Sequence, residues 1–394
     1  MFNKNILISI SLLGLVACGG GGGKSSSTPA PVIKNGVFKD SNVFGLSYVS
    51  GAQKGLTDSS GKFKYEDGKN VNFSIGKIDF GSGLGQAVMT PLDLVENGKL
   101  SDLEVINRIR LLMMLDKDNT PTNGIEISPK VQAKAKDWAE VDFTSTNFLG
   151  EVNTIIVDAS VEDGVSHALP SADAARAHLR TTLLCSVAGA FVGEYAGTES
   201  GNLALMLDPV TGNVKGSSYN PDNQVSVVVN SLTAIDTDSG LGFESGEDSA
   251  KKFNGSVTSS DEIKGTWVNI NDADGKGAFD ASRIGGKSNA VFRYTVAYIS
   301  DSDKGLYAFD VAANNAISGF AYSVVDKSDK ASALTGTLSI DPENDEKLIL
   351  AATAESGAEI NGKVDKATLA LEGVWSNVSA LAAGTFSGGG CKLN

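Results

Sequence analysis

Short runs of alternating apolar and polar residues dominate the chain, and Gly, Asn, Asp and Ser residues separate them. Within residues 33–89, the side chains of Val71, Phe73 and Ile75 fall on one face of a predicted strand. Short strands with turn residues at this spacing are typical of a sandwich of two antiparallel sheets. The pattern therefore predicts a small β-sandwich over residues 33–89.

Residues 90–184 change to a helical pattern. Apolar residues such as Leu103, Ile106 and Ile109 recur every three to four positions, which favours amphipathic helices. Ser128, followed by Pro129, and Ser171 stand where helices are expected to begin. We expect this segment to be a helical connector that leans on the first β-region.

Residues 185–394 return to the alternating pattern and contain a repeat. The segment FNGSVTSSDEIKGTWVNINDADGKGAF, which ends at Phe279, matches INGKVDKATLALEGVWSNVSALAAGTF, which ends at Phe386. Each copy has Asn-Gly, then Gly-x-Trp at Trp267 or Trp375, then Gly-x-Phe. A duplicated β-meander predicts an antiparallel barrel or a sandwich made of two repeated halves, so the fold class is mainly β with a helical insert. Both indoles are expected in the core, and they become ligand-lining candidates if the barrel holds a small molecule.

The N-terminal pattern predicts an exported chain. An apolar run follows Lys4 and ends at Ala17, and it is shorter than the roughly 20 residues of a membrane-spanning helix. Residues 1–17 therefore read as a secretory signal peptide. Residues 18–32 begin with Cys18 and five glycines and continue with Ser, Thr and Pro, which is typical of a flexible tether.

The residues Leu15-Val16-Ala17-Cys18 resemble the lipobox of bacterial lipoproteins. The resemblance implies cleavage before Cys18 and lipidation of its thiol, with acyl chains such as palmitate anchoring the chain in a membrane. Gly19 after the cysteine, rather than Asp, resembles the outer-membrane class of these proteins. The alternative is an ordinary signal peptide with a chance cysteine.

With Cys18 assigned to lipid, two cysteines remain in a chain of 394 residues. Cys185 and Cys391 lie near the two ends of the duplicated region, and exported proteins form disulfides in an oxidising compartment. We expect a Cys185–Cys391 disulfide; the alternative is two buried free thiols.

The formal net charge of −14 argues against nucleic acid or anionic lipid headgroups as the main partner, because both require clustered Lys and Arg. The acidity also raises calcium as a candidate cofactor. Asp116, Asp118, Thr120 and Asn123 supply oxygen ligands in one short segment. The segment lacks the Gly and Glu of an EF-hand, and a turn rich in Asp and Asn explains it more simply.

The chain has two histidines, His167 and His178, and no sequence motif that builds a nucleophilic site around them. Packing roles are therefore the simpler interpretation. We expect the protein not to be an enzyme, and we keep a hydrolase as the last alternative.

Several stretches resemble an uncharacterised, adhesin-like family of Gram-negative surface lipoproteins: TPLDLV, RLLMMLDKDNTPTNGIEIS and AHLRTTLLCSVAGAFVGEYAG. The stretch GLTDSSGKFKYEDG also resembles carboxypeptidase-regulatory-like modules, which are usually scaffolds. The resemblance implies a lipid-anchored protein of the outer membrane with a binding or adhesion role and a protein or glycan partner. The alternative is a ligand-binding barrel of the envelope that captures a small molecule or a host protein.

Overall fold

The computed structural model describes residues 30–232, 234 and 235, 242–246, 251–259, 261–285, 290–325 and 331–393. The predicted signal peptide, Cys18 and most of the predicted tether lie outside the described residues. Contacts between Cα atoms separate the segment up to Val32 from the chain that begins at Ile33.

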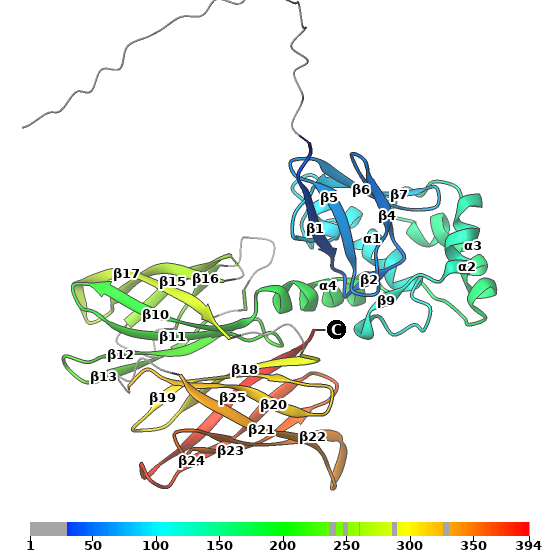
Figure 1. Ribbon diagram of the computed structural model, residues 1–394. Helices are drawn as coiled ribbons and strands as arrows, with labels where there is room; N and C mark the ends of the chain where they lie inside the picture. The colour runs from blue at the N-terminus through cyan, green and yellow to red at the C-terminus, as the bar shows by residue number, and fades with distance from the viewer. Residues whose placement is uncertain are drawn as a thin grey trace, which may run out of the picture. The chain divides into compact units, whose positions relative to one another are not determined.

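The first β-region forms two sheets and a short parallel pair (Figure 1). Val71, Phe73 and Ile75 are buried, as their alternation predicts. The three-stranded sheet has the order β5 (Lys62–Glu66), β1 (Ile33–Phe38), β8 (Val88–Met89). The four-stranded sheet has the order β4 (Gln53–Leu56), β3 (Ser47–Ser50), β6 (Asn70–Ile75), β7 (Ile78–Leu84). The strand β2 (Val43–Phe44) pairs in parallel with β9 (Ile125–Glu126).

Four α-helices follow: α1 (Leu103–Met114), α2 (Pro129–Lys134), α3 (Phe148–Asp163) and α4 (Ala172–Val187). Three short 3₁₀ turns accompany them: η1 (Pro91–Leu94), η2 (Pro121–Asn123) and η3 (Ala135–Asp137). The predicted starts at Ser128 and Ser171 are confirmed, because each hydroxyl accepts a hydrogen bond from a backbone N–H three residues later. Among the described residues, none of the helices has the length and apolar character that crossing a bilayer requires.

The helices pack against the strands of the first β-region and share a core with them. One cluster of buried side chains begins with Phe38 and Phe73 in the strands and continues through Leu112 and Phe148 to Ala159 in the helices. A sandwich of such short strands has little interior of its own, and α1, α2 and α3 supply the apolar side chains that complete it.

The half of the duplicated region that contains the first repeat segment, residues 189–284 and called the first copy below, builds an antiparallel sheet of eight strands. Its spatial order is β13 (Val225–Asn230), β12 (Val214–Asn220), β11 (Gly201–Leu207), β10 (Gly189–Gly197), β17 (Asp272–Ile284), β16 (Glu262–Asn269), β15 (Lys251–Ser259), β14 (Gly242–Glu244). The edge strands β13 and β14 lie at opposite ends of this order. Near those ends, Ser231 forms an isolated bridge with Ser245, and Leu232 N–H donates to the carbonyl of Glu244 over 2.9 Å.

The second copy closes completely. Its eight strands form a barrel in chain order: β18 (Phe292–Ile299), β19 (Lys304–Val311), β20 (Ala316–Ser323), β21 (Ser332–Asp341), β22 (Asn344–Ala354), β23 (Glu359–Asp365), β24 (Ala370–Asn377), β25 (Ala382–Lys392). Strand β18 pairs with β25, so this sheet has no edge strand.

The structure confirms the mainly β fold class with an antiparallel barrel. It also shows that each copy forms a sheet of its own, one open and one closed, where the sequence predicts one barrel or sandwich made of two repeated halves. The register explains this: Tyr195 of β10 lies opposite Phe279 of β17, and Tyr298 of β18 lies opposite Phe386 of β25. In each copy the first strand pairs with the last strand of the same copy.

Candidate functional site

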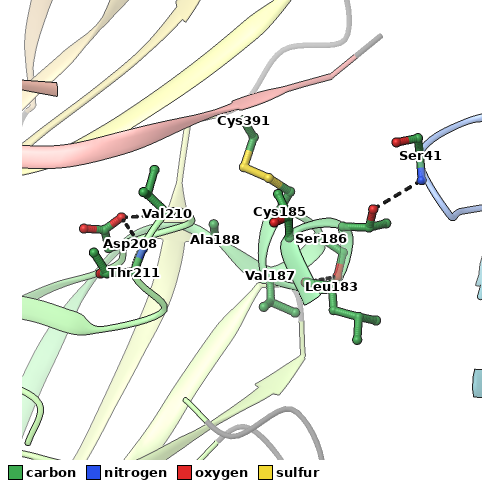
Figure 2. Close-up of a disulfide and its surroundings, with 12 residues drawn as sticks. Ser41, Leu183, Cys185, Ser186, Val187, Ala188, Asp208, Val210, Thr211 and Cys391 are labelled. Atoms are coloured by element: carbon green, nitrogen blue, oxygen red, sulfur yellow. Dashed lines mark hydrogen bonds between the residues drawn. A yellow bond between two sulfur atoms is a disulfide. The ribbon is translucent and has the colours of Figure 1, made fainter. Parts of the chain in front are cut away.

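The predicted disulfide between Cys185 and Cys391 is present and joins the end of α4 to β25 (Figure 2). The two Cα atoms are 5.6 Å apart across 206 positions of sequence. Beside the disulfide, the turn after β11 lies against β25: a Cβ on Gly389 would come within 2.4 Å of Val210 Cγ2. The link therefore fixes the last strand of the barrel to the helix that precedes the duplication.

The same helix contacts the first β-region through two other side chains. The Ser41 backbone N–H donates to the hydroxyl of Thr182 over 3.2 Å (Figure 2). One turn earlier, His178 Nε2 lies 3.3 Å from a carboxylate oxygen of Asp40. Asp40 is fully buried. Among the described residues, neither of its carboxylate oxygens has a hydrogen-bond donor. Burial raises the pKa of Asp40 to about 6, and the nearby His178 opposes this shift.

His167, the other histidine, is buried between two partners. Its Nε2 lies 3.1 Å from Asp163, and its Nδ1 lies 3.1 Å from Asn119. The Ser128 hydroxyl donates to Asp163 over 2.5 Å, so the carboxylate lies between the serine and the histidine. A hydrolytic triad needs the imidazole between the other two groups. This arrangement links α2, α3 and the loop after α1.

The carboxylates of the candidate calcium segment are engaged by their own loop. Asp116 accepts hydrogen bonds from the backbone N–H groups of Thr120 (2.7 Å) and Glu126 (3.0 Å). Asp118 accepts from Thr120 N–H (2.9 Å) and from the side-chain amide of Asn123 (2.9 Å). Burial raises the pKa of Asp116 to about 6. Within the described ranges, no group of three or more His, Cys, Asp or Glu side chains is arranged to hold a metal ion. Calcium binding at this segment stays a prediction.

Trp267 and Trp375 occupy equivalent places in the two copies, and both are core side chains. The rings of Tyr195 and Trp267 lie 5.4 Å apart at 77°, and those of Tyr298 and Trp375 lie 5.2 Å apart at 72°. The glycines of the repeat make room for these rings. A Cβ on Gly384 would come within 2.8 Å of Trp375 Nε1. The interior of the closed barrel around Trp375 is therefore occupied by the chain's own aromatic and aliphatic side chains.

The outer face of the barrel carries a shallow trough of about 700 Å³. Its floor is β25, where Thr385 and Ser387 present only small side chains. Its walls include Ile299 of β18 and Val374 of β24, which are 39% and 57% exposed. Both residues pair with Thr385, so Ile299, Thr385 and Val374 form one row across three neighbouring strands.

An apolar hairpin tip adjoins the trough. The turn between β24 and β25 carries Val378 and Leu381, which are 82% and 93% exposed. Leu381 has a φ of +50°, a left-handed backbone conformation that glycine and asparagine adopt at lower cost. No charged residue occurs from Ser376 through Cys391.

The first copy supplies an internal comparison. Its corresponding turn contains Asn271, Asp272 and Asp274. On its outer face, Lys264 forms ion pairs with Glu262 and Asp280. The aromatic core is thus kept in both copies. The first copy also exposes apolar side chains here, because Val268 and Ile270 are each 44% exposed, but its turn adds carboxylates that the turn with Val378 and Leu381 lacks.

No family model matches the chain, and no curated protein matches it significantly. Solved structures similar to the chain include the isotype 1 transferrin binding protein B from serogroup B Neisseria meningitidis. That match has 14% sequence identity and a TM-score of 0.20, and it covers 52% of this chain and 56% of that chain. Another is a protein of unknown function from the DUF3598 family of Nostoc punctiforme, with 10% identity, a TM-score of 0.18, and coverage of 54% of this chain and 98% of that chain.

Proposed function

We propose that the chain is a lipid-anchored, non-catalytic binding protein of the bacterial outer membrane. In this proposal Cys18 carries the lipid, the glycine-rich segment is the tether, and the folded part from Ile33 onward carries the binding surface. The partner is a protein or a glycan outside the chain.

The observation that carries the proposal is the Cys185–Cys391 disulfide. The two thiols meet across 206 positions, and disulfides of this kind form and persist in exported proteins. The disulfide and the secretory, lipobox-like pattern that ends at Cys18 are far apart in the sequence. Both indicate an exported protein.

The distribution of apolar side chains supports binding through the outer surface. The large rings of the second copy fill its interior, whereas Val374, Val378 and Leu381 are exposed next to a trough. Contiguous exposed apolar surface is typical of sites that meet another molecule. Both histidine side chains are buried next to a carboxylate, His167 beside Asp163 and His178 beside Asp40, and this arrangement gives no support to a hydrolase.

Protease treatment of intact cells tests the proposal, together with a strain that lacks the gene. We expect loss of the folded part on treatment of intact cells, and reduced attachment of the deletion strain to its surface or host material. Full protection from protease, unchanged attachment and no partner in a pull-down would together contradict the proposed function.

A further inference from the structure

The β24–β25 hairpin tip and the trough beside it form one surface, called the tip surface. It is defined by Ile299, Val374, Val378, Leu381 and the small side chains of β25. We propose that the tip surface docks a basic protein segment that carries apolar side chains. This inference rests on the proposed binding function and specifies the chemistry of the partner.

The strained backbone at Leu381 gives a first argument. A branched side chain in the left-handed region is disfavoured relative to the right-handed conformation. Local strain of this kind is common where it positions a side chain for function. Here the strained residue projects into solvent, so its side chain recovers little of that cost by packing within the chain.

The size of the trough gives a second argument. A space of about 700 Å³ with a floor of Thr385 and Ser387 is large enough for several side chains of an extended or helical segment. Leu381 and Val378 at one end would then enter an apolar contact with the same segment. Such a central apolar contact with polar neighbours is the usual anatomy of a protein interface.

Charge identifies the kind of partner. The trough itself is lined by one charge of each sign, Glu372 and Lys363, and Lys363 forms an ion pair with Asp341 over 2.9 Å. The exposed charged residues next to the tip are acidic: Glu355 and Glu359 around the start of β23, and Asp301 after β18. The Asn377 side-chain amide donates to the carbonyl of Ser356 over 3.0 Å, which places the turn that contains Glu355 beside the tip. An apolar tip with an acidic rim complements an apolar segment that carries Lys or Arg.

The same charges argue against two other occupants. Anionic lipid attracts surfaces that combine apolar residues with Lys and Arg, whereas this rim is acidic. A second copy would bring two acidic rims together, and like charges at an interface oppose association.

Selection from a random peptide library displayed on phage tests the proposal, with the purified full-length chain in detergent as the target. We expect enrichment of peptides that combine Leu, Ile, Phe or Trp with Lys or Arg. Their affinity should fall about tenfold or more for Leu381→Asn, because a central interface side chain is removed. Asparagine tolerates the left-handed backbone, so this variant keeps the fold, as circular dichroism would verify.

Ile340→Asn is the matched control. Ile340 is 67% exposed on the same barrel but lies next to the β21–β22 turn, at the opposite end from the tip. Its substitution should leave peptide affinity unchanged.

Three outcomes would overturn the proposal. The first is no enrichment of basic apolar peptides, or equal binding by the wild-type chain and Leu381→Asn. The second is Leu381-dependent binding to vesicles of phosphatidylethanolamine and phosphatidylglycerol in place of peptides. The third is Leu381-dependent dimerisation in light scattering. Because the selection uses purified protein, its failure leaves the anchoring and attachment tests of the proposed function untouched.

Discussion

Gly373 of β24 lies directly against the ring of Phe386 in β25: a Cβ added to Gly373 would come within 2.5 Å of Phe386 Cζ. The first copy repeats this relationship, because a Cβ on Gly265 would come within 2.6 Å of Phe279 Cε1. The glycine of each Gly-x-Trp motif thus lies against the phenylalanine of the following Gly-x-Phe motif. A Cβ there would come closer still to the neighbouring strand, at the carbonyl oxygen of Asn361 or Asn254. This explains why the motif elements occur together in both copies.

Gly373→Ala should therefore destabilise the closed barrel. Forcing a methyl group into a filled core typically costs about 1–3 kcal/mol of unfolding free energy. Urea denaturation followed by tryptophan fluorescence measures the change. Gly242→Ala is the control, because the nearest atom to a Cβ there is 3.7 Å away. Equal stability of the two variants would show that the Phe386 ring and the backbone of β23 accommodate the added methyl group without cost.

Removal of the disulfide should lower the stability of the folded part. In the chain-entropy model, a cross-link across 206 positions constrains the unfolded chain by roughly 5 kcal/mol, which is an upper value. Cys185→Ser combined with Cys391→Ser should unfold at lower denaturant than the oxidised wild-type chain, and reductant should shift only the wild type. Identical curves for all samples would mean that the thiols are unpaired in solution.

Asp40 should make the stability depend on pH. Its carboxyl pKa is raised from 3.8 to about 6 in the folded chain, so the folded state holds the proton more tightly than the unfolded state. This contribution is complete below about pH 4 and is lost as the pH rises through about 6. Relative to Asp40→Asn, the wild type should therefore lose up to about 3 kcal/mol of unfolding free energy between pH 4 and pH 7.

Parallel urea titrations of both chains at the two pH values measure this difference. A wild type that gains stability relative to Asp40→Asn as the pH rises would mean that the attraction between Asp40 and His178 outweighs burial.

Leu381 should be dispensable for folding. Leu381→Asn removes an exposed side chain from a left-handed position, so the unfolding free energy should stay the same or rise by up to about 1 kcal/mol. Leu371→Ala is the matched contrast in the same strand pair, because Leu371 is buried, and it should lose about 2–5 kcal/mol. A loss of similar size in both variants would place Leu381 in the core and remove it from the tip surface.

Local sequence signals predict much of this fold. Ser128 and Ser171 predict two helix starts because an N-cap acts within three residues. The copies around Trp267 and Trp375 predict equivalent hairpins because alternation and turn residues act over similarly short distances. The pairing of Cys185 with Cys391 follows once Cys18 is assigned to lipid.

Two features could not be predicted from the sequence, namely the closure of each sheet within its own copy and the exposure of the apolar turn. Tyr195 has the same alternation whether its strand pairs with β17 of its own copy or with a strand of the other, so sheet closure within each copy is not encoded locally. From its sequence, an apolar turn such as the one with Val378 and Leu381 is expected to be buried. Its exposure depends on the elements packed around it, which the local sequence does not specify.

The central claim is that a lipid on Cys18 holds this folded part at the outer membrane. Metabolic labelling with palmitate and membrane fractionation, applied to the wild type and to Cys18→Ser, test it most directly. We expect label and outer-membrane recovery for the wild type, and neither for the variant. A Cys18→Ser chain that still carries palmitate and stays in the outer membrane would contradict the claim.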